Sequence, residues 1–305
     1  MDKPNTIADR DNGFITFLLV SRLHIVAIAA MGTLTFGWLF TGIQTWTLPV
    51  IAAVDWFLVN LVNRVVDLPE DAANDISGTD WVARYKGALL VVSISILAAS
   101  FVAVQFLEPR IWPLRVAYHL LGFAYNYPLV PLGGGRRIRL KEIYLVKNSA
   151  SALGFMITVF GYPLVAAGGG VHVGPEYIWT MATFFFFSEL SYEVVYDLRD
   201  IQGDRRAGVP TFPVMHGIEV TRSIVYGLLA ISALALITGY AMAWIDWRAF
   251  VMIIGLAVQL AAYQRFRRRG VTASNCIVLT LLGAGLLLAY NAWVWSGLPL
   301  DPFAG

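Results

Sequence analysis

One run of residues decides how this sequence folds and what it is expected to bind: Ser188-Glu-Leu-Ser-Tyr-Glu-Val-Val-Tyr-Asp-Leu-Arg-Asp-Ile-Gln-Gly-Asp204. The run carries five carboxylates, which are Glu189, Glu193, Asp197, Asp200 and Asp204. At about 100° per residue, helical geometry places all five within about 80° of one face. Like charges at this spacing repel one another. The stripe therefore predicts that something cationic is held against it.

The sequence around this run is typical of a membrane protein. Of the 305 residues, 58% are apolar and 14% are charged, whereas soluble domains have about 45–50% and about a quarter. These proportions exclude a soluble globular protein and a disordered one. Cys276 is the only cysteine, which excludes an internal disulfide and a cysteine-cluster metal site. The net charge of +2 gives no indication of nucleic-acid binding.

Nine apolar stretches are long enough to cross the hydrocarbon core, which takes about 20 residues. They lie at 14–40, 45–66, 86–107, 112–132, 143–166, 177–197, 219–242, 248–264 and 273–295. Glycine and proline occupy the connections between them, as expected of turns. The sequence therefore predicts an all-α integral membrane protein with nine transmembrane helices.

The basic residues lie almost entirely on one side of these spans. When the sides are numbered alternately, 19 of the 22 Lys and Arg residues fall on the side of the N-terminus, and only Arg110, Arg115 and Arg248 fall on the other. The positive-inside rule assigns the richer side to the cytoplasm. A missed or superfluous span would distribute the basic residues over both sides, so the division supports nine spans. We therefore expect a cytoplasmic N-terminus and an external C-terminus.

A second polar stripe ends on the same side. Asn63, Asp67 and Asp71 are four residues apart at the end of the second span, so a continuous helix places them within about 80° of one face. Pro69 interrupts that helix, and Asp71 is expected either beyond a kink or in the following loop. Carboxylates suit hard divalent cations, and Mg²⁺ takes one or two of them together with substrate phosphate oxygens. The two stripes predict a magnesium-bridged phosphate or diphosphate at the cytoplasmic mouth of the bundle.

Several cations near this mouth suit an anionic ligand. Arg22 and Lys147 lie inside predicted spans, and four more crowd the loop after the fourth span: Arg136, Arg137, Arg139 and Lys141. Each also fits ordinary anchoring, in which a long basic side chain reaches the membrane interface.

Both acidic motifs resemble those of the UbiA superfamily of intramembrane prenyltransferases. The first reads Asn63-Arg-Val-Val-Asp67-Leu-Pro-Glu-Asp71-Ala-Ala-Asn74. The second reads Tyr196-Asp197-Leu-Arg-Asp200-Ile-Gln-Gly-Asp204-Arg-Arg-Ala-Gly208, followed by Thr211-Phe-Pro-Val and Gly217. The resemblance implies a single UbiA-type domain over residues 1–305, with nine transmembrane helices around a central cavity. It also implies a place in the cell membrane, with the mouth of the active site facing the cytoplasm.

The resemblance further implies the roles of individual residues. Five aspartates would hold Mg²⁺ on the diphosphate of an isoprenoid donor: Asp67, Asp71, Asp197, Asp200 and Asp204. All of them except Asp197 form the implied catalytic set. Diphosphate contacts are implied for Asn63, Lys147, Arg22, Arg136, Arg137, Tyr127 and Tyr196. Many members place Asp directly after the motif asparagine, and this chain has Arg64 there.

The implied reaction moves a prenyl group from a prenyl diphosphate to a lipophilic acceptor in the bilayer. Ionisation separates an allylic carbocation from pyrophosphate, which metal ions and basic side chains stabilise. A lipid-embedded cavity keeps the carbocation from water, and aromatic faces stabilise it. The candidates are Trp56, Phe57, Tyr125, Phe184 to Phe187 and Tyr192. Membrane lipid is the expected surrounding partner, and no nucleic acid is expected.

Two other functions remain open at this stage. The first is an intramembrane terpene cyclase, which would use the same diphosphate site without an acceptor. The second is a cation-coupled transporter, although transporters tend to place such carboxylates near the midplane and to carry internal repeats. The sequence leaves the acceptor, the donor chain length and the general base unassigned.

Overall fold

The protein is described by a computed structural model that covers residues 16–17, 20–74, 76–132 and 134–297. Helices make up nearly all of the regular structure in these ranges. Their bounds are α2 (Leu23–Thr41), α3 (Thr47–Val66), α4 (Leu68–Ala73), α5 (Thr79–Leu107), α6 (Trp112–Asn126), α7 (Val146–Phe155), α8 (Tyr162–Ala167), α9 (Pro175–Ala207), α10 (Phe212–Ala241), α11 (Trp247–Phe250), α12 (Ile253–Arg267) and α13 (Ala273–Trp295). Two short strands, β1 (Val130–Pro131) and β2 (Arg137–Ile138), pair antiparallel.

Within the described ranges, seven helical segments are long and apolar enough to cross a membrane: α2, α3, α5, residues 146–167, α10, residues 247–267 and α13. These seven segments indicate a multi-pass membrane protein. The other two predicted spans are also helical, but α6 has only 15 residues and α9 carries the acidic stripe. The number nine and the direction of insertion therefore stay predictions.

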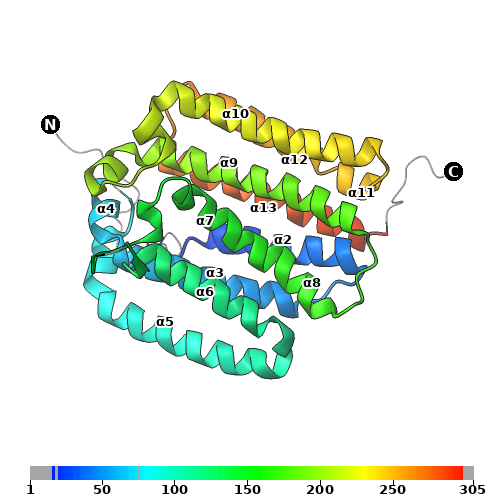
Figure 1. The fold of residues 1–305 in the computed structure, drawn as a ribbon, viewed down its shortest axis with the longest axis horizontal. Coiled ribbons are helices and arrows are strands. Elements are labelled where there is room, and N and C mark those ends of the chain that lie inside the picture. The colour runs from blue at the N-terminus through cyan, green and yellow to red at the C-terminus, as the bar shows by residue number, and fades with distance from the viewer. Residues whose placement is uncertain (1–15, 18–19, 75, 133, 298–305) are drawn as a thin grey trace.

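The long helices lie side by side along the long axis of the molecule, with α5 along one edge and α10 along the opposite edge (Figure 1). Helix α2 packs against α3 and α13, and α9 packs against α10 and α7. Aromatic rings fill the middle: Phe36 of α2 lies 4.4 Å from Phe160 and 5.2 Å from Phe185, measured between ring centroids. The short helix α4 lies at one end of the bundle, and α11 lies at the other (Figure 1).

Some predicted spans end at different residues in the structure, and proline explains one clear case. The predicted span 112–132 stops being helical at Asn126, because Tyr127 precedes Pro128 and is extended, with φ −115° and ψ 148°. A residue before proline is disfavoured in the helical region. The predicted span 177–197 instead continues to Ala207, so the whole acidic stripe lies on one helix. The predicted start of the first span at residue 14 lies outside the described residues.

A buried ionic cluster ties α3, α5, α6 and α8 together, away from the α4 end. Asp55 of α3 accepts hydrogen bonds from Arg115 Nε at 3.0 Å and from Tyr162 Oη at 2.7 Å, and it lies 3.0 Å from His119 Nε2. Arg115 also donates to the Ser100 carbonyl at 3.0 Å. The side chains of Asp55 and Arg115 are 0% exposed. The charge count placed Arg115 among the three cations of the outer side, and in the structure its side chain is buried inside the protein.

Candidate active site

The first acidic motif lies where one helix ends and another begins. Helix α3 ends at Val66, and Asp67 caps it with φ −89° and ψ 18°. Pro69 then falls in the first turn of α4, where its missing N–H costs no hydrogen bond. Of the two alternatives open from the sequence, Asp71 therefore lies beyond a break, in a new short helix.

The second acidic motif, on α9, contacts the first motif next to α4. The Gly203 N–H of α9 donates to Asn74 Oδ1, just after α4, at 2.8 Å. A Cβ at residue 203 would overlap the Asn74 side chain, so glycine is needed for this close approach. Asp71 consequently lies within electrostatic range of Asp200. Carboxylates about 130 residues apart in sequence thus meet at the α4 end of the bundle.

Each aspartate of the first motif is paired with a buried cation. Lys141 Nζ lies 2.5 Å from Asp67 Oδ1 and 2.6 Å from Glu70 Oε2, and Lys141 is 2% exposed. Asp71 accepts a hydrogen bond from Arg64. Arg64 also donates to the Ser77 carbonyl at 2.8 Å. The arginine that departs from the common motif therefore neutralises the motif's own second aspartate.

Two aspartates of the second motif are paired in the same way. Asp197 contacts Lys147 and Asn148, which begin α7. Asp200 accepts from Arg199 Nε at 2.6 Å. Within the described residues, no three acidic, histidine or cysteine side chains lie close enough together to hold a metal ion. In this arrangement, cationic side chains balance most of the acidic charge.

The oxygen atoms at this end nonetheless suit Mg²⁺. Asn63 Oδ1 and Asp204 Oδ2 are buried and have no hydrogen-bond partner among the described residues. Buried oxygens without partners are costly in a protein interior, and oxygen is the ligand atom that Mg²⁺ prefers. The donor set at the α4 end is therefore chemically appropriate for a hard divalent cation.

Burial also changes the acid strength of the first motif. Desolvation raises the pKa of Asp67 and of Asp71 above the usual aspartate range, although Lys141 and the nearby arginines oppose this shift. Burial disfavours the charged form of a carboxyl group. The motif therefore gains from an added cation that keeps both groups ionised.

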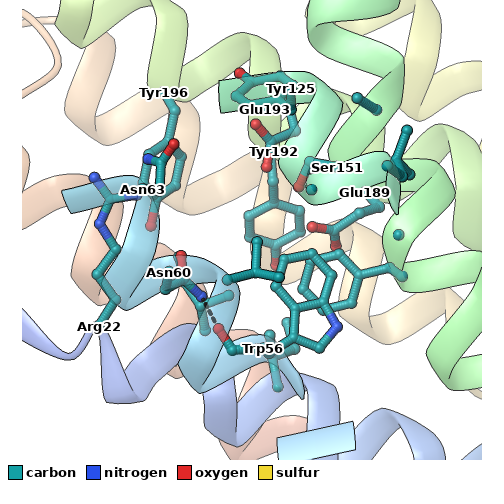
Figure 2. Close-up of a pocket in the computed structure, with 18 of the residues that line it drawn as sticks. Arg22, Trp56, Asn60, Asn63, Tyr125, Ser151, Glu189, Tyr192, Glu193 and Tyr196 are labelled. Atoms are coloured by element: carbon teal, nitrogen blue, oxygen red, sulfur yellow. Dashed lines mark hydrogen bonds between the residues drawn. The ribbon is translucent and has the colours of Figure 1, made fainter. Parts of the chain in front are cut away.

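A cavity of about 140 Å³ runs into the bundle next to the two motifs, and Asn63 and Tyr196 line it whereas none of the five motif aspartates does. Its polar end is lined by Arg22, Asn63, Tyr125, Glu193 and Tyr196 (Figure 2). Its inner end is lined by Trp56, Tyr118, Phe155, Tyr192 and Glu189. The Trp56 and Phe155 rings stack there at 3.9 Å between centroids. The cavity thus joins a charged mouth to an aromatic interior.

Three of the twelve predicted site residues line this cavity. Arg22, at a left-handed break before α2 (φ 48°), lines the cavity, as do Asn63 and Tyr196. The Tyr196 hydroxyl also lies 2.9 Å from Thr280 Oγ1. Lys147, in the first turn of α7, forms an ion pair with Asp197.

Three predicted residues lie elsewhere. Arg136 and Arg137 are exposed around β2, away from the cavity lining. Tyr127 is 38% exposed and lines a separate cavity between α3, α5 and α6. Tyr125, two residues earlier, faces the site instead. Among the other aromatic candidates, Trp56 and Tyr192 line the cavity, and Phe57 does not.

Sequence reasoning missed three residues that the fold brings in. Lys141 was treated as one cation of a basic loop, and nothing in its spacing marks it as the partner of Asp67. Ser151, one turn after Lys147, was not singled out and lines the cavity. Arg64 was noted only as a departure from the motif, and its pairing with Asp71 was not predicted. Glu193 was part of the predicted stripe, and its place in the cavity follows from that periodicity.

Comparison with known proteins agrees with this geometry. The sequence model of the UbiA prenyltransferase family matches residues 14–281. A UbiA homologue from Archaeoglobus fulgidus bound to GPP and Mg²⁺ is 17% identical, with a TM-score of 0.69 over 92% of this chain and 99% of that one. The same homologue bound to DMAPP and Mg²⁺ is 16% identical, with a TM-score of 0.67 over 93% and 100%.

A digeranylgeranylglyceryl phosphate synthase is a more distant structural neighbour, 15% identical with a TM-score of 0.57 over 91% of this chain and 95% of that one. No curated protein matches the chain significantly. The structural likeness is one of fold, and the family match covers most of the chain. The chain belongs to the UbiA prenyltransferase family.

Proposed function

We propose that this protein is a Mg²⁺-dependent prenyltransferase that moves an isoprenoid group from a prenyl diphosphate to a lipophilic acceptor inside the membrane. The observation that carries the proposal is the contact of the two acidic motifs, through Gly203 and Asn74, next to a cavity with an aromatic interior. The Archaeoglobus fulgidus homologue with this fold has been observed with DMAPP or GPP and Mg²⁺, which supports the same donor class here.

All nine long helical segments would cross the membrane in this proposal. The acidic stripe of α9 would lie at the cytoplasmic face. Helix α6, which has only 15 residues, would cross the membrane packed against its neighbouring helices. The division of 19 cations against 3 supports a cytoplasmic N-terminus and a cytoplasmic mouth.

The aspartates of both motifs would hold the metal, namely Asp67, Asp71, Asp197, Asp200 and Asp204, with Asn63 as a further oxygen ligand. When bound, Mg²⁺ would neutralise charge on the diphosphate oxygens and so favour departure of pyrophosphate. Because cations now pair with most of these carboxylates, binding would require an exchange of partners. Lys147 and Arg199 would turn from carboxylates to the diphosphate.

The side chains below the mouth would stabilise the carbocation and keep it from water. The bond between C1 and the diphosphate oxygen breaks, and both electrons leave with pyrophosphate, which Lys147 and Arg22 stabilise. The allylic cation then faces the rings of Tyr125, Tyr192 and Trp56, whose π electrons attract positive charge. The apolar walls keep water away until the acceptor attacks.

The test is turnover by the purified protein with Mg²⁺, an allylic diphosphate and a membrane lipid extract. We expect release of pyrophosphate together with a prenylated lipid. Asp67→Ala and Asp204→Ala should abolish both, while Asp80→Ala, which removes an exposed carboxylate of α5, should leave both unchanged. A cyclic hydrocarbon formed from the donor alone would identify a cyclase. Ion uptake into liposomes without pyrophosphate release would identify a transporter.

A further inference from the structure

A second cavity of about 250 Å³ lies between α2, α9, α12 and α13. Its walls are mainly apolar and aromatic, with Phe36, Phe184, Phe185, Tyr290 and Trp293 among them. It shares Ile28, Glu189 and Tyr192 with the first cavity. The two cavities therefore meet at Glu189, below the charged mouth, and two apolar ligands can approach each other there.

The second cavity differs from the first in charge. Among its lining residues, Glu189 is the only acidic or basic side chain, and none is Lys, Arg or His. Two other polar side chains of the lining are hydrogen-bonded: Ser188 Oγ lies 3.3 Å from Gln259 Oε1, and Gln259 Nε2 donates to Ser191 Oγ at 2.7 Å. A buried carboxylate or phosphate is stable only beside a compensating cation. An anionic acceptor is therefore disfavoured here.

Glu189 is itself without a partner. It is 6% exposed, and it makes no hydrogen bond or ion pair with any described residue. The charged group that influences Glu189 electrostatically is Glu193, another acid. Figure 2 shows the Glu189 carboxyl group directed into the cavity, near Trp56 and Tyr192. Ionisable groups inside a membrane protein are expensive and usually functional.

The position of Glu189 along α9 also suits chemistry at the end of a bound donor. Eight residues separate it from Asp197, which is about 12 Å at 1.5 Å per residue. The diphosphate and the reacting carbon of the donor would occupy part of this length. Glu193 lies between the two but is influenced by Lys147 and by a hydrogen bond with Ser151. Glu189 is thus the carboxylate that no cation engages.

We propose that the second cavity binds a neutral, largely hydrocarbon acceptor and that Glu189 is the base that removes its proton. This inference rests on the proposed function. The donor C1–O bond breaks and its electron pair leaves with pyrophosphate. A π bond of an alkene or arene carbon on the acceptor forms the new C–C bond to C1. The C–H bond at that carbon then breaks, its electrons restore the π bond, and the proton passes to the Glu189 carboxylate, for which the allylic cation formed beside it is the compensating charge.

The first arm of the test compares two acceptors with the same ring system, 1,4-dihydroxynaphthalene and its 2-carboxylic acid. We expect the neutral compound to be prenylated at least about 100-fold more efficiently, because the acid would bury a carboxylate beside Glu189 without a cation. Preference for the acid would overturn the proposal, and so would failure to prenylate the neutral compound in a preparation that binds and ionises the donor.

The second arm tests the base. Glu189→Gln keeps the size of the side chain and removes its basicity, so transfer should fall about 100-fold or more while the KM for the acceptor and the Kd for donor with Mg²⁺ stay unchanged. Wild-type kcat in this variant would remove Glu189 from the mechanism. Loss of donor binding would instead mean that Glu189 belongs to the donor site, which also overturns the assignment.

The third arm tests the cavity with a matched pair of glycines. Gly255 lines the second cavity, and a Cβ there meets nothing within 4 Å, so Gly255→Phe should fill the space without strain and raise the acceptor KM at least about 10-fold. Gly285 has equal room but faces outward from α13, so Gly285→Phe is the control. If Gly255→Phe changes the donor chain-length preference instead, the cavity holds the donor tail. Absence of pyrophosphate release from any donor in the wild type would reject the proposed function itself.

Discussion

The buried ionic cluster around Asp55 gives the sharpest prediction about stability. Asp55→Ala removes the acceptor of Arg115, Tyr162 and His119 at once. Arg115, which is 0% exposed, then keeps a charge in the protein interior with only the Ser100 carbonyl and hydroxyl, both at 3.0 Å, to receive its hydrogen bonds. Breaking a buried ion pair in this way costs about 3–5 kcal/mol.

The expected result is a lower thermal midpoint in detergent. At about 2 °C per kcal/mol for a chain of this length, the loss corresponds to a fall of about 6–10 °C. The chain carries its own reporter, because Cys276 is the only cysteine and is 0% exposed in α13. A thiol-reactive fluorescent dye will label it only as the helices separate, so the labelling curve follows unfolding.

A double variant separates lost charge balance from lost packing. Asp55→Ala with Arg115→Met removes both charges, and apolar replacement of a buried pair is often neutral or stabilising, so the midpoint should recover by more than half. Arg110→Ala removes an exposed arginine with one hydrogen bond to the Ala166 carbonyl at 3.2 Å, and it should leave the midpoint unchanged. A midpoint for Asp55→Ala within about 1 °C of the wild type would refute the reasoning, as would a double variant no more stable than the single one.

Four further predictions concern the mouth of the bundle. Removal of Mg²⁺ by a chelator should stop pyrophosphate release, and added Mg²⁺ should restore it; turnover in the chelator would contradict the metal assignment. Lys147→Ala should raise the donor KM about 10-fold or more, and an unchanged donor dependence would take Lys147 out of the site. Gly203→Ala should weaken Mg²⁺-dependent turnover because its Cβ would separate Asn74 from α9, whereas Gly227→Ala, with open space around it, should have no effect. Since burial raises the pKa of Asp67 and Asp71, these groups take up protons at a higher pH than an ordinary aspartate does. The apparent affinity for Mg²⁺, measured at three successively lower pH values, should therefore decline as the pH falls, and a constant affinity would contradict this.

The sequence predicted the helices well because the lipid environment makes their signal local. A run of about 20 apolar residues must form a helix to satisfy its backbone in hydrocarbon, so neither distant contacts nor side-chain packing is needed to find it. The acidic stripe of α9 was predictable for the same reason, since helical periodicity alone puts Glu189 and Asp204 on one face.

Contacts between distant segments were not predictable in this way. Lys141 is 74 residues from Asp67, and no local signal distinguishes it from Arg136 or Arg137 in the same loop. Tyr125 and Tyr127 are both near the end of the fourth predicted span, and in the structure Tyr125 lines the cavity while Tyr127, where α6 ends before Pro128, lines a separate one. Charge counting likewise cannot separate an anchoring arginine from one that is buried against Asp55.

The pairing of charges at the mouth suggests why Arg64 is tolerated inside the first motif. Asp71 with Arg64, Asp67 with Lys141, Asp197 with Lys147 and Asp200 with Arg199 make four opposite pairs. On the proposed function, Mg²⁺ and the diphosphate carry opposite charges. When both bind, the basic side chains can pair with the diphosphate and the carboxylates with the metal, so the total charge of the mouth changes little. Buried charge that stays balanced throughout avoids the desolvation cost of an isolated ion. It follows that Arg64→Ala, which frees Asp71 from its cation, should strengthen Mg²⁺ binding in the absence of donor, and weaker binding in that variant would show that Arg64 positions Asp71 rather than competing with the metal.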